Sequence, residues 1–180
     1  MLNSLVAGKA TGLIGLSSKI LRLSAPIISP WITVIFNQSF RTGIFPDERK
    51  LAKVSHLFMN KKGNKRNNPD HYRPISILPV VEKVSERIVY NQLYNYLTKN
   101  NLLTKNQSGF RTNHSTVTSL LHTTNEIYTN ADNGLITGNV FIDLKKAFDS
   151  VNHEILLRKL DLYGLKGITL QWFKSFLSNR

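Results

Sequence analysis

The chain has 180 residues, of which 41% are hydrophobic, and its 24 Lys and Arg against 11 Asp and Glu give a net charge of +13. This length fits one domain, or one domain and part of another, with enough apolar content for a core, which argues against a disordered chain. The positive charge indicates a polyanionic partner, with nucleic acid the first candidate and an anionic membrane surface the second. The absence of cysteine and the wide spacing of the five histidines argue against disulfides and a zinc enzyme.

The first 46 residues are expected to form a helical extension. Residues 23–40 are the longest uncharged run, but Pro26 and Pro30 and several polar residues make this run too broken to span a membrane. No acidic residue precedes Asp47, so a mitochondrial leader is an alternative, although the prolines and Trp31 favour folded structure. We expect an intracellular protein, in the cytoplasm or nucleus, with no membrane partner.

Positive charge is concentrated between residues 49 and 73, where eight Lys and Arg accompany only one acid, Asp70. Residues 61–69 lack hydrophobic periodicity and contain several turn formers, which predicts a basic loop; a solvated surface loop without function is the alternative. The prolines within residues 71–79 predict a stiff, extended segment. A guanidinium held there, at Arg73, suits bidentate phosphate binding better than a flexible Lys would.

Apolar spacing predicts four helices further along the chain: residues 80–99, a helix capped by Ser115, residues 155–164 and residues 168–177. Gln107-Ser108-Gly109-Phe110-Arg111 lies between the first two. A Gly beside an aromatic and an Arg lets the backbone approach a nucleic acid while the ring and guanidinium stack or contact phosphate. The alternative is a simple turn between helices, with Phe110 docked in the core.

Residues 140–142 are β-branched or aromatic, which predicts a short buried strand that ends at Asp143. Burying an unpaired carboxylate would cost several kcal/mol, so the pattern predicts a cation partner. A hard divalent ion such as Mg2+ is one such partner, and Asp143 would then face a phosphoryl-transfer centre. The alternatives are that Asp143 caps a helix over residues 144–150 and that Phe148 is an ordinary core aromatic.

Taken together, these segments resemble the reverse transcriptases, most closely those of non-LTR (LINE or jockey-like) retrotransposons. The resemblance covers residues 9 to 180 and implies an α+β fold: the fingers and a partial palm of a right-hand polymerase, helix-rich, with short strands and an incomplete sheet. It divides the chain into an N-terminal helical extension (1–46), fingers (47–138) and partial palm (139–180). The matching strings are Lys9-Ala10-Thr11-Gly12, Tyr72-Arg73-Pro74-Ile75-Ser76, Gln107-Ser108-Gly109-Phe110-Arg111, and Phe141-Ile142-Asp143 with residues 146–151.

The resemblance also implies a role for individual residues. Asp143 would bind the catalytic Mg2+ ions, and Phe148 would screen the sugar of the incoming nucleotide. His56 stands where the family has a proline, so the family's phosphate-binding lysine could be Lys61 or Lys62. The implied nucleotide-binding residues are Arg73, Lys61, Lys62, Ala147 and Phe148, and the implied template-binding residues are Gln107, Gly109 and Arg111.

Several features depart from the family pattern. Two-metal catalysis needs further carboxylates that bridge ions about 4 Å apart, which the family supplies from an aromatic-x-Asp-Asp hairpin. This sequence contains no Asp-Asp pair, and Asp149 is expected to cap or to pair with a Lys instead. Ile14 stands where an acid is frequent and Arg49 where an aromatic is usual. Ser85 replaces a large apolar residue and, if it faces inward, leaves a cavity that costs about 1 to 3 kcal/mol.

Three functional hypotheses follow. The first is a fragment of a retrotransposon RNA-directed DNA polymerase, inactive alone, whose intact ancestor extended primer 3′ ends by two-metal nucleotidyl transfer. Its partners would be an RNA template, a DNA primer, deoxynucleoside triphosphates, and a missing palm and thumb segment or a partner chain. The second is a non-catalytic basic module that binds RNA or DNA through Arg73, Arg111 and residues 61–66. The third is an aggregation-prone by-product without function, since half a palm leaves strand edges unpaired.

Overall fold

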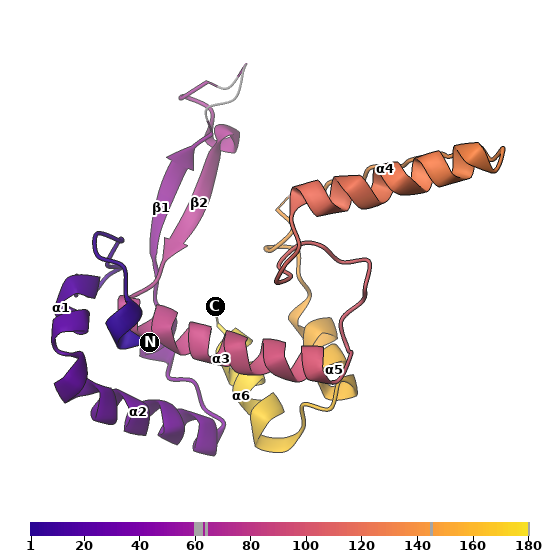
Figure 1. Ribbon diagram of the computed structural model, residues 1–180. Helices are drawn as coiled ribbons and strands as arrows, with labels where there is room; N and C mark the ends of the chain where they lie inside the picture. The colour runs from indigo at the N-terminus through magenta and orange to yellow at the C-terminus, as the bar shows by residue number, and fades with distance from the viewer. Residues whose placement is uncertain (60–62, 64, 145, 180) are drawn as a thin grey trace. The chain divides into compact units, whose positions relative to one another are not determined.

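A computed structural model describes residues 1–59, 63, 65–144 and 146–179. These residues form two compact units, shown in Figure 1: unit 1 comprises Met1–Tyr94 and His153–Arg180, and unit 2 comprises Asn95–Asn152. Helices combined with a two-stranded sheet make the fold α+β, as predicted. The elements in chain order are the 3-10 turn η1 (Leu2–Ser4), α1 (Ser18–Leu23), α2 (Ala25–Thr42), η2 (Asp47–Lys50), β1 (Lys53–Phe58), η3 (Pro69–His71), β2 (Tyr72–Ile77), α3 (Val80–Lys99), α4 (Thr116–Asp132), α5 (His153–Leu162) and α6 (Gly167–Leu177).

The N-terminal part of unit 1 is helical. Pro26 lies in the first turn of α2, where its missing N–H costs nothing, and Pro30 lies inside the helix, which ends at Gly43 in the left-handed conformation. The core that this helix forms with α3 contains Leu2, Ala25, Phe36 and Val84. Among the described residues, no helix is long and apolar enough to cross a membrane.

A second part of the unit 1 core forms around Trp172 of α6. The Trp172 ring is 3% exposed and contacts four other aromatic rings, and its Nε1–H donates to Ser39 Oγ at 2.9 Å. Its ring partners are Phe40, Phe45, Phe173 and Phe176. Trp172 is therefore a core residue of unit 1.

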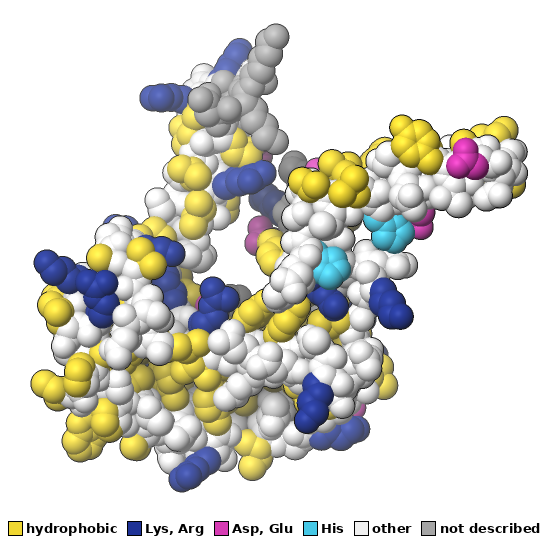
Figure 2. All heavy atoms as spheres, viewed as in Figure 1, with side chains coloured by type: hydrophobic (Ala, Val, Ile, Leu, Met, Phe, Trp, Pro, Cys, Tyr) yellow, Lys and Arg dark blue, Asp and Glu magenta, His cyan; other side chains and the backbone are white. Residues whose placement is uncertain are grey.

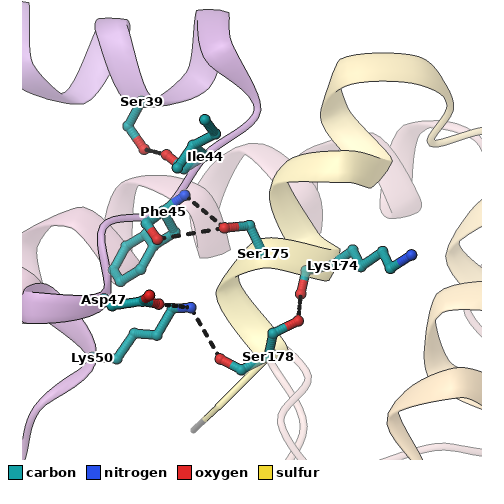
Figure 3. A network of polar contacts seen from close by, with 8 residues as sticks. All are labelled: Ser39, Ile44, Phe45, Asp47, Lys50, Lys174, Ser175 and Ser178. Atoms are coloured by element: carbon teal, nitrogen blue, oxygen red, sulfur yellow. Dashed lines mark hydrogen bonds and ion pairs between the residues drawn. The ribbon is translucent and has the colours of Figure 1, made fainter.

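Polar contacts fasten α6 to the segment that follows α2 (Figure 3). The Phe45 N–H donates to Ser175 Oγ at 2.9 Å. The buried Lys50 ammonium donates to Asp47 Oδ1 at 2.6 Å and to the Ser178 carbonyl at 3.0 Å. Residues more than 120 positions apart in the chain are thus joined within one unit.

Strands β1 and β2 form an antiparallel hairpin that projects from the helices of unit 1 in Figure 1. The register pairs Leu57 with Arg73 and His56 with Pro74, so the predicted extended segment is a strand over residues 72–77. Pro74 is tolerated because each strand of a two-stranded sheet is an edge strand. Lys61 and Lys62, in the predicted basic loop, lie outside the described residues.

The predicted helices are present at α3, α4, α5 and α6. Helix α4 begins with a capping box in which Ser115 Oγ accepts from the Thr118 N–H, and the Thr118 hydroxyl accepts from the Ser115 N–H. Ser85 is 2% exposed and therefore faces inward on α3. This is the orientation for which the sequence predicts a cavity beside its small side chain.

Unit 2 exposes its apolar side chains. Helix α4 contains no buried residue, and Figure 2 shows hydrophobic side chains along its surface. The predicted buried strand at residues 140–142 is wrong, because Phe141 is 91% exposed and the segment has no ladder partner among the described residues. A strand is stabilised by its neighbours, so strand propensity alone does not fix it. The four most exposed apolar residues of this unit are Ile136, Val140, Phe141 and Ile142.

Candidate nucleic-acid and nucleotide site

Arg73 lies on the exposed surface of β2. Side chains alternate along a strand, so Arg73 shares a face of the hairpin with Leu57, its direct partner, and with Lys53, which pairs with Ile77. The hairpin is a stiff support that leaves the Arg73 guanidinium accessible to an anionic ligand. This matches the sequence-based expectation that the backbone would hold an Arg there in extended conformation.

The outer end of the hairpin is organised by a small aromatic and basic cluster. The Phe58 and Tyr72 rings lie 5.3 Å apart, and the Arg66 guanidinium lies 5.8 Å from the Phe58 ring. Tyr72 donates its hydroxyl to the Arg66 carbonyl at 2.8 Å, and the Lys65 N–H donates to His71 Nδ1 at 2.7 Å. These contacts fix the backbone around Lys65 and Arg66. The two cationic side chains are thereby placed at the outer end of the hairpin.

In unit 2, the segment predicted to contact template packs against the segment that follows Asp143. The rings of Phe110 and Phe148 lie 6.0 Å apart at 79°, an edge-to-face contact between residues far apart in sequence. Phe110 adopts a positive φ of 60°, and Gln107 Nε2 donates to the Gly109 carbonyl at 3.0 Å. Phe148 is 77% exposed, so the alternative of an ordinary core aromatic is wrong.

Arg111 has the least satisfied side chain of this segment. Its Nε and Nη1 atoms are buried, and neither has a hydrogen-bond partner in the described part of the chain. Buried guanidinium nitrogens normally bind an acceptor, because an uncompensated charge is costly to bury. An acceptor such as a phosphate oxygen has the chemistry to pair with these two nitrogens.

Asp143 is exposed in the structure, so the expectation of a buried carboxylate is wrong. The turn that follows it is closed by the Asp149 N–H, which donates to the Lys146 carbonyl at 3.0 Å, and by Ser150 Oγ, which donates to the Ala147 carbonyl at 2.9 Å. The predicted alternative of a helix over residues 144–150 is not formed in its described part. Asp143 stands before this turn as an accessible carboxylate.

The residues present do not by themselves fit a two-metal centre. Two bridged ions need several carboxylates, and Mg2+ is usually held by one or two carboxylates together with phosphate oxygens and water. Across the described residues, no group of three or more His, Asp or Glu side chains is placed to hold a metal ion. Asp143 could supply one ligand, and the remaining ligands would have to come from elsewhere.

One structurally important pair escaped prediction. Arg49 Nε donates to both carboxylate oxygens of Glu82 at 2.8 Å, and the Arg49 guanidinium also lies 4.7 Å from the Phe36 ring. The two side chains are 15% and 7% exposed. Arg49 precedes β1 and Glu82 follows β2, so this ion pair closes the base of the hairpin that carries Arg73. The only sequence signal was an Arg where the family has an aromatic.

The comparisons with known proteins show which family the chain belongs to. Residues 59–180 match the family model described as reverse transcriptase (RNA-dependent DNA polymerase). The chain therefore belongs to the reverse transcriptase family.

Its relatives within that family are polymerases of mobile elements. The chain is 35% identical over 130 residues to the probable RNA-directed DNA polymerase from transposon BS of Drosophila melanogaster, covering 72% of this chain and 14% of that protein. It is 31% identical over 180 residues to the RNA-directed DNA polymerase from mobile element jockey of Drosophila funebris, covering 100% of this chain and 19% of that protein. The predicted resemblance to jockey-like polymerases is confirmed, and the chain spans less than a fifth of these relatives' length.

Proposed function

We propose that this chain forms the fingers and the first palm segment of a retrotransposon RNA-directed DNA polymerase, and that it binds template and incoming nucleotide. Arg73 at the hairpin contacts the triphosphate, and Gln107, Gly109 and Arg111 contact the template. The observation that carries the proposal is the contact between Phe110 and Phe148, which joins the template segment to the nucleotide-screening segment within unit 2. The unpaired Arg111 nitrogens support an anionic ligand at the same place.

Nucleotidyl transfer requires more than these residues provide. Reverse transcriptases as a family use Mg2+, and Asp143 is the residue proposed to bind it in the complete polymerase. The sequence has no Asp-Asp pair to supply the other carboxylates, so we expect the chain alone to bind substrates without extending a primer. Division into an extension (1–46), fingers (47–138) and partial palm (139–180) stays a prediction.

Primer extension tests the catalytic part of the proposal. Purified chain, an RNA template annealed to a labelled DNA primer, deoxynucleoside triphosphates and Mg2+ are expected to give no extended product. Extension by the chain that disappears in Asp143→Ala would contradict the proposed dependence on additional carboxylates.

Fluorescence anisotropy with the same template and primer tests the binding part. Arg111→Gln is expected to weaken binding of the template and primer, and Arg73→Gln is expected to weaken binding of a deoxynucleoside triphosphate added to that complex. Arg41→Gln, which removes an exposed Arg from α2, serves as the matched control. Loss of one phosphate contact to the single-stranded overhang of the template weakens binding about fivefold at about 0.1 M salt, because each contact contributes about 0.7 to the salt slope of a single strand. A template-primer affinity of Arg111→Gln equal to that of Arg41→Gln would overturn the role of Arg111, and an equal nucleotide affinity of Arg73→Gln and Arg41→Gln would overturn the role of Arg73.

A non-catalytic RNA- or DNA-binding module is the second candidate. The net charge of +13 and the cations at the end of the hairpin favour it. It predicts affinity that falls steeply with salt and is unchanged in Asp143→Ala. Affinity that is flat across moderate ionic strength would exclude it.

A further inference from the structure

A cavity of about 530 Å³ lies in unit 1 between the N-terminal segment and the first half of α3. Its volume is within the range of about 300 to 1,000 Å³ in which proteins hold small ligands. We call it the N-terminal groove. Its lining includes the apolar side chains of Leu5 and Val84 and the polar side chains of Lys9, Lys83, Arg87 and Asn91.

The N-terminal segment is held in place by close backbone packing. Gly12 has a φ of 72°, and a Cβ atom built on it would lie 2.7 Å from the backbone nitrogen of Pro79, too close for any other residue. Lys83 Nζ donates to the Ala10 carbonyl at 2.9 Å. These contacts hold the segment that carries Lys9 against residues 78–83, so the groove is built by specific contacts between two distant parts of the sequence.

Among the described residues that line the groove, the charged side chains are all positive. Lys9, Lys83 and Arg87 contribute three cations, and no acidic side chain is among the described residues that line it. Glu82, next to Lys83 in sequence, is buried and paired with Arg49. The positive charge is therefore available to an anionic ligand, with two N–H groups of Lys83 remaining after its bond to Ala10.

Aromatic rings extend this surface along α3. The Arg87 guanidinium lies 5.6 Å from the Tyr90 ring, and Tyr90 stacks on Tyr94 at 5.6 Å and 19°. Residues 83, 87, 90 and 94 recur at helical spacing and so share one face of α3. Contact with the ring orients the Arg87 guanidinium, whose planar group binds phosphate oxygens in pairs.

We propose that the N-terminal groove binds the sugar-phosphate backbone of a single-stranded nucleic acid, which continues along the ridge of Tyr90 and Tyr94. Cations along a groove beside aromatic side chains are the combination that binds single strands without sequence preference. A membrane surface is the less suitable partner, because interfacial binding uses an amphipathic helix with an apolar outer face rather than a concave groove. The inference extends the proposed function, but it uses none of Arg73, Arg111 and Asp143.

Anisotropy titration of the whole chain with a fluorescein-labelled oligouridylate of about 20 nucleotides tests the groove. Arg87→Gln and Lys9→Gln each remove an exposed cation, and Arg41→Gln is the control with the same charge change outside the groove. Each groove variant is expected to bind about fivefold more weakly at about 0.1 M salt, with the salt slope reduced by about 0.7. Arg87→Lys keeps the charge and is expected to recover part of the affinity.

Comparison of variants separates this inference from the proposed function. Weaker binding in Arg87→Gln and Lys9→Gln than in Arg41→Gln supports the groove, whatever Arg73→Gln and Arg111→Gln do. If Arg111→Gln weakens binding while the groove variants match Arg41→Gln, the groove is excluded and the proposed template role of Arg111 stands. Binding to phosphatidylserine vesicles that Arg87→Gln alone abolishes, with unchanged affinity for oligouridylate, would assign the groove to anionic lipid and overturn the proposal.

Discussion

The two units of this chain differ in how their apolar side chains are covered. Every buried hydrophobic residue of the described chain lies in unit 1, including Leu21, Val80, Leu160 and Trp172, whereas unit 2 contains none. Unit 2 nevertheless carries the proposed template segment, residues 107–111, together with Asp143 and Phe148. Hydrophobic residues alone therefore do not make a core, because they also need facing surfaces to pack against. The site residues of unit 2 are supported mainly by local turns and one aromatic contact.

Truncating one aromatic side chain in each unit is expected to give the largest difference in unfolding free energy. Trp172→Ala removes a buried ring and its hydrogen bond to Ser39, which should cost about 3 to 5 kcal/mol of unfolding free energy. Phe141→Ala removes a ring that is 91% exposed and should change stability by less than about 0.5 kcal/mol. Urea denaturation measures the unfolding free energy of both variants. Similar losses of stability would contradict the difference between the units, because they would place Phe141 in a core.

Breaking the ion pair at the base of the hairpin should have the next largest effect. Glu82→Ala leaves the Arg49 guanidinium largely buried without its carboxylate, at a cost of about 3 kcal/mol. Asp161→Ala is the matched control, because its pair with Lys166 spans 3.4 Å at an exposed position and should contribute less than about 1 kcal/mol. Equal denaturation midpoints for the two variants would show that the buried pair does not stabilise unit 1.

Alanine substitutions at Gly12 and Gly15 distinguish the cost of a steric clash from the cost of backbone strain within unit 1. Both have positive φ, but a Cβ at Gly12 meets the backbone of residues 78 and 79, whereas a Cβ at Gly15 meets nothing within 4 Å. Gly15→Ala should cost about 1 kcal/mol from strain alone, and Gly12→Ala should cost more, up to about 3 kcal/mol. Thermal denaturation measures the difference. If Gly12→Ala is no more destabilising than Gly15→Ala, the N-terminal segment does not pack on residues 78 and 79 as described.

The smallest effect is expected from the cap of α4 in unit 2. Ser115→Ala removes the acceptor for the Thr118 N–H and should destabilise the helix by about 1 kcal/mol. Because α4 has no buried residue, the loss should appear as faster amide exchange in residues 116–132 while the denaturation midpoint of unit 1 stays unchanged. A matching shift of that midpoint would show that the two units unfold together.

Local signals in the sequence predicted most helices and the conformation of the Arg73 segment. The spacing of Val81, Val84 and Ile88 follows from helical geometry alone, and Ser115 satisfies backbone donors within its own turn. The strand at residues 140–142 could not be predicted reliably, because strand formation depends on a hydrogen-bonded neighbour that local propensity does not reveal.

The candidate site was predictable where motif residues stand close together in sequence, as at Gln107 to Arg111. Contacts between distant residues were not, because a single sequence carries no record of which residues meet. The pair of Arg49 with Glu82, the ring contact of Phe110 with Phe148 and the packing of Gly12 on Pro79 are of this kind.

Hydrogen exchange of the whole chain, with and without an RNA template annealed to a DNA primer and a deoxynucleoside triphosphate, tests the central claim most directly. The account predicts slower exchange on binding in residues 107–111 of unit 2 and in the hairpin strands, residues 53–58 and 72–77. The control is residues 167–177 of α6, which carry no proposed contact and should be unchanged. Unchanged exchange in both the template segment and the hairpin, under conditions in which anisotropy shows the nucleic acid bound, would contradict the assignment of these residues to template and nucleotide.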